Sequence, residues 1–117
     1  MEIGVDIVEI SRIRALYDRF GPVFMRRILT EAEIVQCLSR PDPVASLAGR
    51  FAAKEAVSKA LGTGISRGLS WRSIEVLNDE AGKPHVTLHT GNPPCRVSIS
   101  ISHDRHSAIA MAVVEPA

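Results

Sequence analysis

The stretch from Asp42 to Gly62 constrains the fold most, because it predicts one long helix with small side chains along one side. Asp42 followed by Pro43 is a typical helix start, and Gly62 is a typical stop after Leu61. At roughly 100° per residue, small residues gather on one face of this helix: Gly49, Ala52, Ala53, Ala56 and Ala60. Such a face lets the helix backbone approach a sheet closely, so we expect the long helix to pack directly on strands.

Two shorter helices are predicted before this segment. Ser11 can cap the first, which runs to Phe20, where Gly21-Pro22 ends it. The capping-box pattern of Thr30 and Glu33 opens the second.

Alternating apolar and polar residues predict strands at the start of the chain and after the long helix. The expected strands cover residues 2–7, 71–77, 84–90, 96–102 and 107–115, with turns at 78–83 and 103–106 and a loop at 91–94. We therefore expect an α+β fold, in which an antiparallel sheet packs against one long and two shorter helices. A single domain over residues 1–117 is expected for a chain of this length.

Composition and charge exclude several classes of protein. A formal net charge of +1 argues against nucleic-acid binding by bulk electrostatics. The longest apolar run, residues 108–114, is too short to span a bilayer, and the acidic start lacks the pattern of a signal peptide. Cys37 and Cys95 form no CxxC pair, so we expect reduced thiols rather than zinc ligands. The sequence thus favours a cytoplasmic protein without a membrane or nucleic-acid partner.

Three charged residues are candidates for chemistry. Glu55 and Lys59 lie one turn apart on the long helix, where an exposed ion pair is the simplest interpretation. Asp6 interrupts an apolar strand and points opposite to Val5 and Ile7, so by itself we expect it to face solvent. Two carboxylates from different elements, with cations nearby, would nevertheless suit Mg²⁺.

Glycines and histidines give weaker signals. Backbone N–H groups at Gly62 and Gly64 could approach a phosphate, although a helix end and turn explain Gly62 equally well. His103 ends a predicted strand, and a solvated turn histidine is the simpler interpretation. His85 and His89 alternate with Thr87 and are expected to make one solvated face rather than a metal pair.

Several short segments occur together in a characteristic order. They are Gly4–Ile10, Arg50–Ala56, Leu61–Ile65, Gly82–Pro84 and Ile99–His103. Their combination and spacing resemble the holo-acyl-carrier-protein synthase family of phosphopantetheinyl transferases over nearly the whole chain.

The resemblance implies transfer of the 4′-phosphopantetheine arm of coenzyme A to a serine of an acyl carrier protein. Asp6 and Glu55 would bind Mg²⁺ together with the pyrophosphate of coenzyme A, and Lys59 would neutralise charge on the leaving group. For the base that accepts the serine proton, Glu55, acting directly or through a metal-bound water, is favoured over Asp6.

The same resemblance implies a set of residues that contact coenzyme A. Ser58 and Lys59 would line its phosphates, and the glycines of the Gly62–Gly64 segment lie where backbone N–H groups could approach them. Arg50 and His103 would bind the nucleotide end, including the 3′-phosphate, and the turn before Pro84 would border the adenine.

Asp104 and Ser107 depart from the family pattern, which has a small hydroxyl residue and an aromatic residue at these places. An acid beside a phosphate site is unfavourable. We therefore expect Asp104 to point away from the site or to pair with Arg105.

A local excess of positive charge points to an acidic partner. Residues 11–29 carry five arginines against one acid: Arg12, Arg14, Arg19, Arg26 and Arg27 against Asp18. A solvated basic face is the simpler alternative, but the family substrate, acyl carrier protein, is acidic. We expect Arg12, Arg19 and Arg27 to dock it.

The final strand, residues 108–114, is apolar on both faces and is expected to be covered by another layer or another chain. The resemblance implies a homotrimer with shared active sites, in which Asp6 of one chain works with His103 of the next. Two alternatives remain: a non-catalytic nucleotide or coenzyme A binding module, and an interaction domain that uses the clustered arginines.

Overall fold

A computed structural model describes residues 1–65, 69–90 and 94–117 of the chain. The elements follow in the order β1 (Glu2–Glu9), α1 (Ile10–Phe20), α2 (Pro22–Ile28), α3 (Glu31–Leu38), α4 (Val44–Ala60), a 3-10 turn (Trp71–Ser73), β2 (Ile74–Asn78), β3 (Pro84–Leu88), β4 (Cys95–His103) and β5 (Ser107–Pro116). The predicted mixture of helices and antiparallel strands is confirmed. None of the helices in these ranges is long and apolar enough to cross a membrane.

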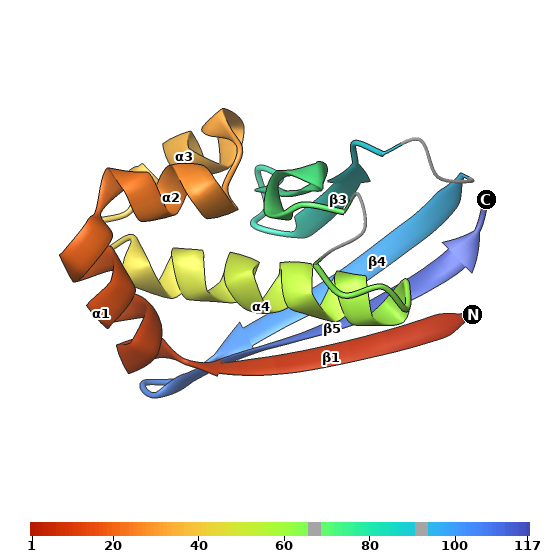
Figure 1. Ribbon diagram of the computed structural model, residues 1–117, viewed down its shortest axis with the longest axis horizontal. Helices are drawn as coiled ribbons and strands as arrows, with labels where there is room; N and C mark the ends of the chain where they lie inside the picture. Colours follow the sequence, from red (N-terminus) through yellow and green to blue (C-terminus); the bar gives the residue numbers. More distant parts are fainter. Residues whose placement is uncertain (66–68, 91–93) are drawn as a thin grey trace.

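The strands form two separate antiparallel pairings. A three-stranded sheet has the order β1-β5-β4, and β2 and β3 form a two-stranded sheet (Figure 1). Both predicted hairpins are confirmed, but residues 71–73, which were expected to begin a strand, form the 3-10 turn, so β2 begins at Ile74. Because β5 lies between β1 and β4, the two edges of the larger sheet carry residues from opposite ends of the chain.

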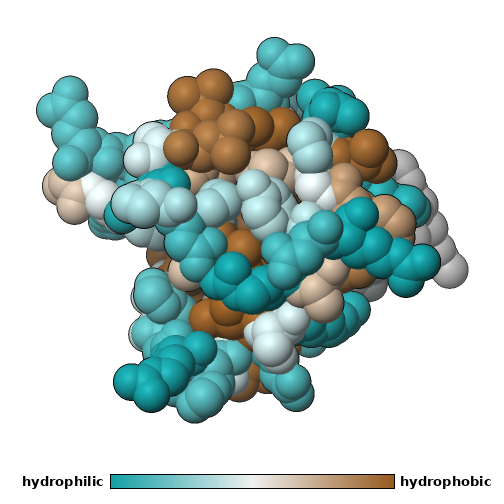
Figure 2. Space-filling view, turned by 90° about the vertical axis from the view of Figure 1, so that its left-hand side faces the viewer, coloured by the Kyte–Doolittle hydropathy of each residue, from teal (hydrophilic) through white to brown (hydrophobic). Residues whose placement is uncertain are grey.

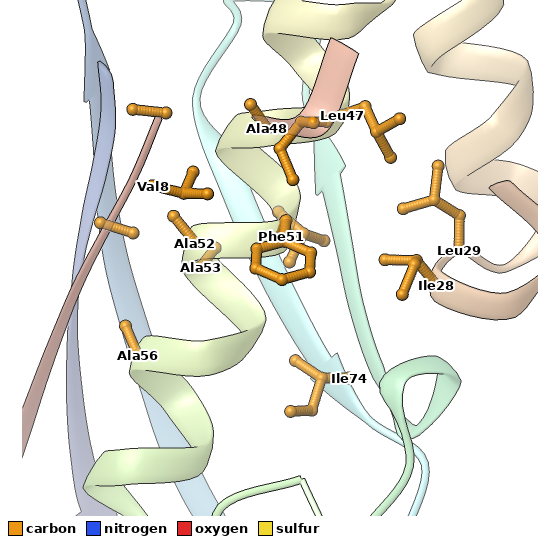
Figure 3. Packing of buried hydrophobic residues seen from close by; sticks show 14 of the residues in the cluster. Val8, Ile28, Leu29, Leu47, Ala48, Phe51, Ala52, Ala53, Ala56 and Ile74 are labelled. Atoms are coloured by element: carbon orange, nitrogen blue, oxygen red, sulfur yellow. The ribbon is translucent and has the colours of Figure 1, made fainter. Parts of the chain in front are cut away.

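Helix α4 lies directly on one face of the three-stranded sheet (Figure 1). A Cβ atom added at Gly4 of β1 would lie 1.9 Å from the carbonyl oxygen of Ala56, so only glycine permits this approach. Figure 3 shows Ala48, Ala52 and Ala56 on the side of α4 that faces the strands, with Ile28 at the end of α2 and the following Leu29 on the other side. The predicted small-residue face therefore does pack on the sheet.

The start of α1 and the presence of α2 differ from the sequence-based expectation. Helix α1 begins with Glu9 at the N-cap position, so the prediction of a Ser11 cap is wrong. The Ile10 N–H instead donates to the carbonyl oxygen of His106 over 2.8 Å. Gly21 does end α1, but Pro22 also opens α2, because proline suits the first turn of a helix. The part of the chain that the structure describes thus has three short helices before α4, not two.

The ends of α3 and α4 agree more closely with the sequence pattern. Thr30 and Glu33 form the expected capping box at the start of α3. The carboxylate of Asp42 accepts a hydrogen bond from the Val44 N–H over 3.1 Å, although the N-cap position itself falls one residue later than predicted. Gly62, with φ of +81°, follows the end of α4.

A buried ion pair joins α4 to the helices and the small sheet. The Lys54 ammonium donates to a carboxylate oxygen of Glu33 over 2.7 Å, and both side chains are fully buried. Lys54 also donates to the carbonyl oxygens of Ile28 and Trp71, and Glu33 accepts from the Val76 N–H. Burial lowers the pKa of Lys54, while the charge of Glu33 opposes that shift. The sequence pattern indicated Glu33 only as a capping residue.

The opposite face of the three-stranded sheet is apolar and uncovered in this chain. The exposed side chains are Ile3, Val5 and Ile7 of β1 and Ile109 and Met111 of β5. Strand register places them together, because Val5 pairs with Met111 and Ile7 with Ile109. The face of β5 toward α4 carries Ala108, Ala110 and Ala112, which are buried.

We expect the Gly4→Ala variant to lose at least about 2 kcal/mol of unfolding free energy, because its Cβ would force the backbones of β1 and α4 apart. The matched control is Gly49→Ala on α4, where the added Cβ would meet no backbone atom but the Ile101 side chain, at 3.1 Å. The control should change the unfolding free energy by less than about 1 kcal/mol, since alanine also favours the helix. Chemical denaturation at one protein concentration measures both. A Gly4→Ala variant as stable as the original protein would contradict the close packing.

Candidate active site

Asp6 and Lys59 meet at the edge where β1 passes α4. The Lys59 ammonium lies 3.0 Å from a carboxylate oxygen of Asp6 and 3.1 Å from the Val5 carbonyl oxygen. The expectation that Asp6 faces solvent is wrong: Val5 and Ile7 are on the exposed side, and the Asp6 side chain, 16% exposed, faces the helix. The helix pattern alone had suggested an ion pair between Lys59 and Glu55. In the structure Lys59 pairs with Asp6 instead.

Glu55 lies beside this pair. Burial raises the pKa of Glu55, and the negative charge of Asp6 raises it further, against the opposing charges of Lys59 and Arg12. The two carboxylates are therefore close enough to influence one another. We call Asp6, Glu55 and Lys59 the carboxylate centre.

The carboxylate centre fits Mg²⁺ chemically. Magnesium prefers oxygen ligands, keeps several waters, and is usually held by one or two carboxylates together with substrate phosphates. Within the described ranges, no group of three or more His, Cys, Asp or Glu side chains could hold a metal by itself. Asp6 and Glu55 are the residues that could hold such an ion, together with a phosphate ligand.

A pocket of about 450 Å³ lies on the other flank of α4, between that helix, β4 and the start of β3. Its lining includes five residues from the predicted family segments: Arg50, Gly82, Pro84, Ile101 and His103. The structure adds residues that the sequence did not indicate, notably Arg40, Ser46 and Asn78. These come from separate loops and elements, and no local pattern marks them.

Arg50 is 3% exposed, yet no carboxylate among the residues that the structure describes pairs with its guanidinium. Its Nε donates to the Val76 carbonyl oxygen over 3.0 Å, Nη1 to the Ser46 hydroxyl, and Nη2 to Gln36 Oε1 over 2.6 Å. None of the ion pairs in the described ranges includes Arg50. A buried charge without a counter-charge is costly, so this pocket favours an anion.

At the end of α4, the hydrogen-bond donors of three predicted site residues bond to carbonyl oxygens of the same helix: Ser58, Gly62 and Gly64. The Ser58 hydroxyl is buried and donates to the Glu55 carbonyl oxygen over 2.8 Å. The N–H groups of Gly62 and Gly64 bond the carbonyl oxygens of Lys59 and Ser58, and both glycines have positive φ. This geometry agrees with the helix-end explanation, because all three donors form hydrogen bonds within the chain.

Asp104 has a local role in the turn between β4 and β5. Its carboxylate accepts hydrogen bonds from the N–H groups of His106 and Ser107, each over 2.8 Å, rather than pairing with Arg105. These bonds lower the pKa of Asp104. Asp104 thus stabilises the turn that follows His103.

The other titratable candidates lie outside both regions. His85 and His89 are exposed, as expected, and contact Asp79 and Glu75 over 2.9 Å and 3.2 Å. Cys37 is buried and Cys95 is half-buried, and both are free thiols.

The carboxylate centre and the pocket do not meet within one chain. Asp6 and Ile101, which lines the pocket, both pair with Ala110 of β5 and so lie on opposite sides of that strand. Glu55 follows Arg50 by five positions, which places it about 140° around the helix. One chain therefore presents the two regions on different flanks.

Basic and apolar side chains share the surface of α1 and α2. Arg12, Arg19 and Arg27 are exposed there, together with Phe20 and Val23. Arg12 lies over the Phe51 ring at 5.8 Å, next to the carboxylate centre. Figure 2 views the molecule from the end that holds these helices. Hydrophilic residues surround apolar ones on this surface.

Comparison with known proteins gives consistent results. The sequence model of the 4′-phosphopantetheinyl transferase superfamily matches residues 2–114. A holo-acyl-carrier-protein synthase of Chlorobaculum tepidum is 74% identical over 116 residues, covering 99% of each chain. A holo-acyl-carrier-protein synthase from Bacillus anthracis, crystallised in complex with CoA (3′,5′-ADP), is 43% identical with a TM-score of 0.88, over 99% of this chain and 96% of that one.

A second solved structure, the Helicobacter pylori holo-acyl-carrier-protein synthase in complex with coenzyme A, is 42% identical with a TM-score of 0.87. The match covers 97% of this chain and 99% of that one. Sequence and fold agree: the chain belongs to the 4′-phosphopantetheinyl transferase superfamily, among its holo-acyl-carrier-protein synthases.

Proposed function

We propose that this chain transfers the 4′-phosphopantetheine arm of coenzyme A to a serine of apo acyl carrier protein. The observation that carries the proposal is the pocket in which the buried Arg50 guanidinium, without a carboxylate partner, lies near His103. A phosphate-bearing nucleotide supplies the missing negative charge. The similarity to synthases whose solved structures hold coenzyme A supports the same assignment.

The carboxylate centre would carry the reaction. The serine oxygen attacks the phosphorus that bears the pantetheine arm, the bond from that phosphorus to the leaving oxygen breaks, and adenosine 3′,5′-bisphosphate departs. Asp6 and Glu55 would hold Mg²⁺, which would polarise the phosphoryl oxygens and stabilise the developing charge. Glu55 would accept the serine proton, with Asp6 as the second candidate.

Lys59 and the pocket residues would hold the leaving group. The contact between Lys59 and Asp6 is partly exposed, so a phosphate can replace it at little cost. Lys59 then neutralises the charge on the departing pyrophosphate oxygen. Arg50 and His103 bind the 3′-phosphate, and the turn at Gly82 and Pro84 borders the adenine.

We further propose that the active enzyme is a homotrimer with sites shared between neighbouring chains. The separation of the carboxylate centre from the pocket supports this arrangement, because one coenzyme A molecule must reach both. The uncovered apolar face around Val5, Ile7, Ile109 and Met111 supports burial against another copy.

The arginines of α1 and α2 suit the acidic carrier protein. Arg12, Arg19 and Arg27 would attract its charge, and Phe20 and Val23 would supply apolar contact beside them. Residues 1–117 would act as one domain in the cytoplasm, where carrier proteins and coenzyme A are available.

Incubation of the purified protein with coenzyme A, Mg²⁺ and apo acyl carrier protein should add one phosphopantetheine group to each carrier, as measured by intact mass. Removal of divalent cations with EDTA should abolish the gain, and added Mg²⁺ should restore it, because the two carboxylates would hold the ion. Coenzyme A binding without any mass gain, over several acidic carriers, would instead identify a non-catalytic binding module.

The Asp6→Asn and Glu55→Gln variants should each lower turnover by at least about a hundredfold, or ~2.7 kcal/mol of barrier, since each removes a ligand charge and preserves shape. Circular dichroism should show both variants folded. Glu2→Gln, an exposed change on the same strand as Asp6, is the matched control and should keep full activity. If either active-site variant retained normal turnover at low Mg²⁺, that residue would not be a ligand.

Asp6→Ala and His103→Ala proteins, each nearly inactive, should regain activity when they are unfolded together and refolded as mixed trimers. Random mixing would give about a quarter of the sites an intact Asp6 from one chain and an intact His103 from the next. The control mixture of Asp6→Ala with Glu55→Gln should stay inactive, because both changes fall on the same side of the site. Failure of the first mixture, with mixed trimers shown to form, would assign both residues to one chain's site.

A further inference from the structure

Gln36 of α3 lies behind the pocket and contacts two of its walls. Its Oε1 accepts hydrogen bonds from Arg50 Nη2 over 2.6 Å and from the Asn78 N–H over 2.9 Å. Its Nε2 donates to the Asn78 carbonyl oxygen over 2.9 Å. The side-chain amide thus bonds both backbone groups of Asn78, as a neighbouring strand would, at the point where β2 ends.

The contact with Gln36 orients Arg50. Three of the five guanidinium N–H donors are engaged by Val76, Ser46 and Gln36. All three acceptors are neutral oxygens, so the guanidinium is held in place while its charge is not cancelled. Glutamate at position 36 would have nearly the same shape, but it would place a carboxylate within ion-pair distance of Arg50.

We propose that Gln36 is a positioning residue that holds Arg50 and Asn78 in the nucleotide pocket, and that its neutrality leaves the Arg50 charge available to the 3′-phosphate. This inference rests on the proposed function, which places the nucleotide end of coenzyme A in this pocket. It assigns to α3, which contributes no residue to the carboxylate centre, a role in selecting a 3′-phosphorylated nucleotide.

The test compares binding of adenosine 3′,5′-bisphosphate and adenosine 5′-phosphate by isothermal titration calorimetry, so that it does not depend on turnover. The Gln36→Glu variant should bind the bisphosphate at least about tenfold more weakly, because its new carboxylate would form an ion pair with Arg50 and cancel the charge that attracts the 3′-phosphate. Its affinity for adenosine 5′-phosphate should change less than about threefold. The Gln36→Met variant, which keeps the Arg50 charge but loses the anchor, should show a smaller loss of bisphosphate affinity and a lower melting temperature.

The matched control is Val35→Glu, which adds the same charge on the same helix at a side chain that is 70% exposed. It should leave both affinities unchanged. If Gln36 had a purely structural role, the Gln36→Glu variant would have a lower melting temperature and would bind both nucleotides more weakly by the same factor. That result would overturn the inference. The inference also fails if folded Gln36→Glu keeps the full preference for the bisphosphate. If the unsubstituted protein itself shows no preference, the proposed placement of the nucleotide fails instead.

Discussion

The close contact between α4 and β1 positions both functional regions. At Gly4 the two backbones approach so tightly that a Cβ atom would lie 1.9 Å from the Ala56 carbonyl oxygen. This approach brings Glu55 and Lys59, on one flank of α4, beside Asp6 of β1. On the other flank it sets Arg50 against the pocket near the end of β4. A larger residue in that interface would separate Asp6 from the helix.

Two buried cations of α4, one turn apart, have opposite roles. Lys54 meets the carboxylate of Glu33 and so joins α4 to the short helices and the small sheet. Among the described residues, the hydrogen-bond partners of Arg50 are neutral oxygens, and its side chain lines a pocket. Because a buried charge is stable only near a counter-charge, the first cation fixes the layers and the second favours an anionic ligand. The identity of the acceptors, not the depth of burial, distinguishes them.

Short sequence patterns predicted helices and strands correctly where a single local rule, such as capping or side-chain periodicity, decides the structure. The small face of α4, the capping box at Thr30 and the two hairpins all follow from short-range patterns. The prediction missed α2 because Pro22 can both end one helix and begin another. It misplaced the start of α1 because Ile10 bonds to His106, almost a hundred positions away in the chain. A distant partner of this kind leaves no local pattern.

The sequence by itself determined the residue types of the site and, through their order and spacing, the family to which the chain belongs. It also determined that Asp6 lies opposite to Val5 and Ile7, because side chains alternate along a strand. Only the tertiary structure decided that Asp6 faces the helix while its apolar neighbours stay exposed, and that Arg50 has Gln36 and Ser46 as partners. Alternation defines two faces of a strand, but which face is covered depends on packing between elements that are distant in the sequence.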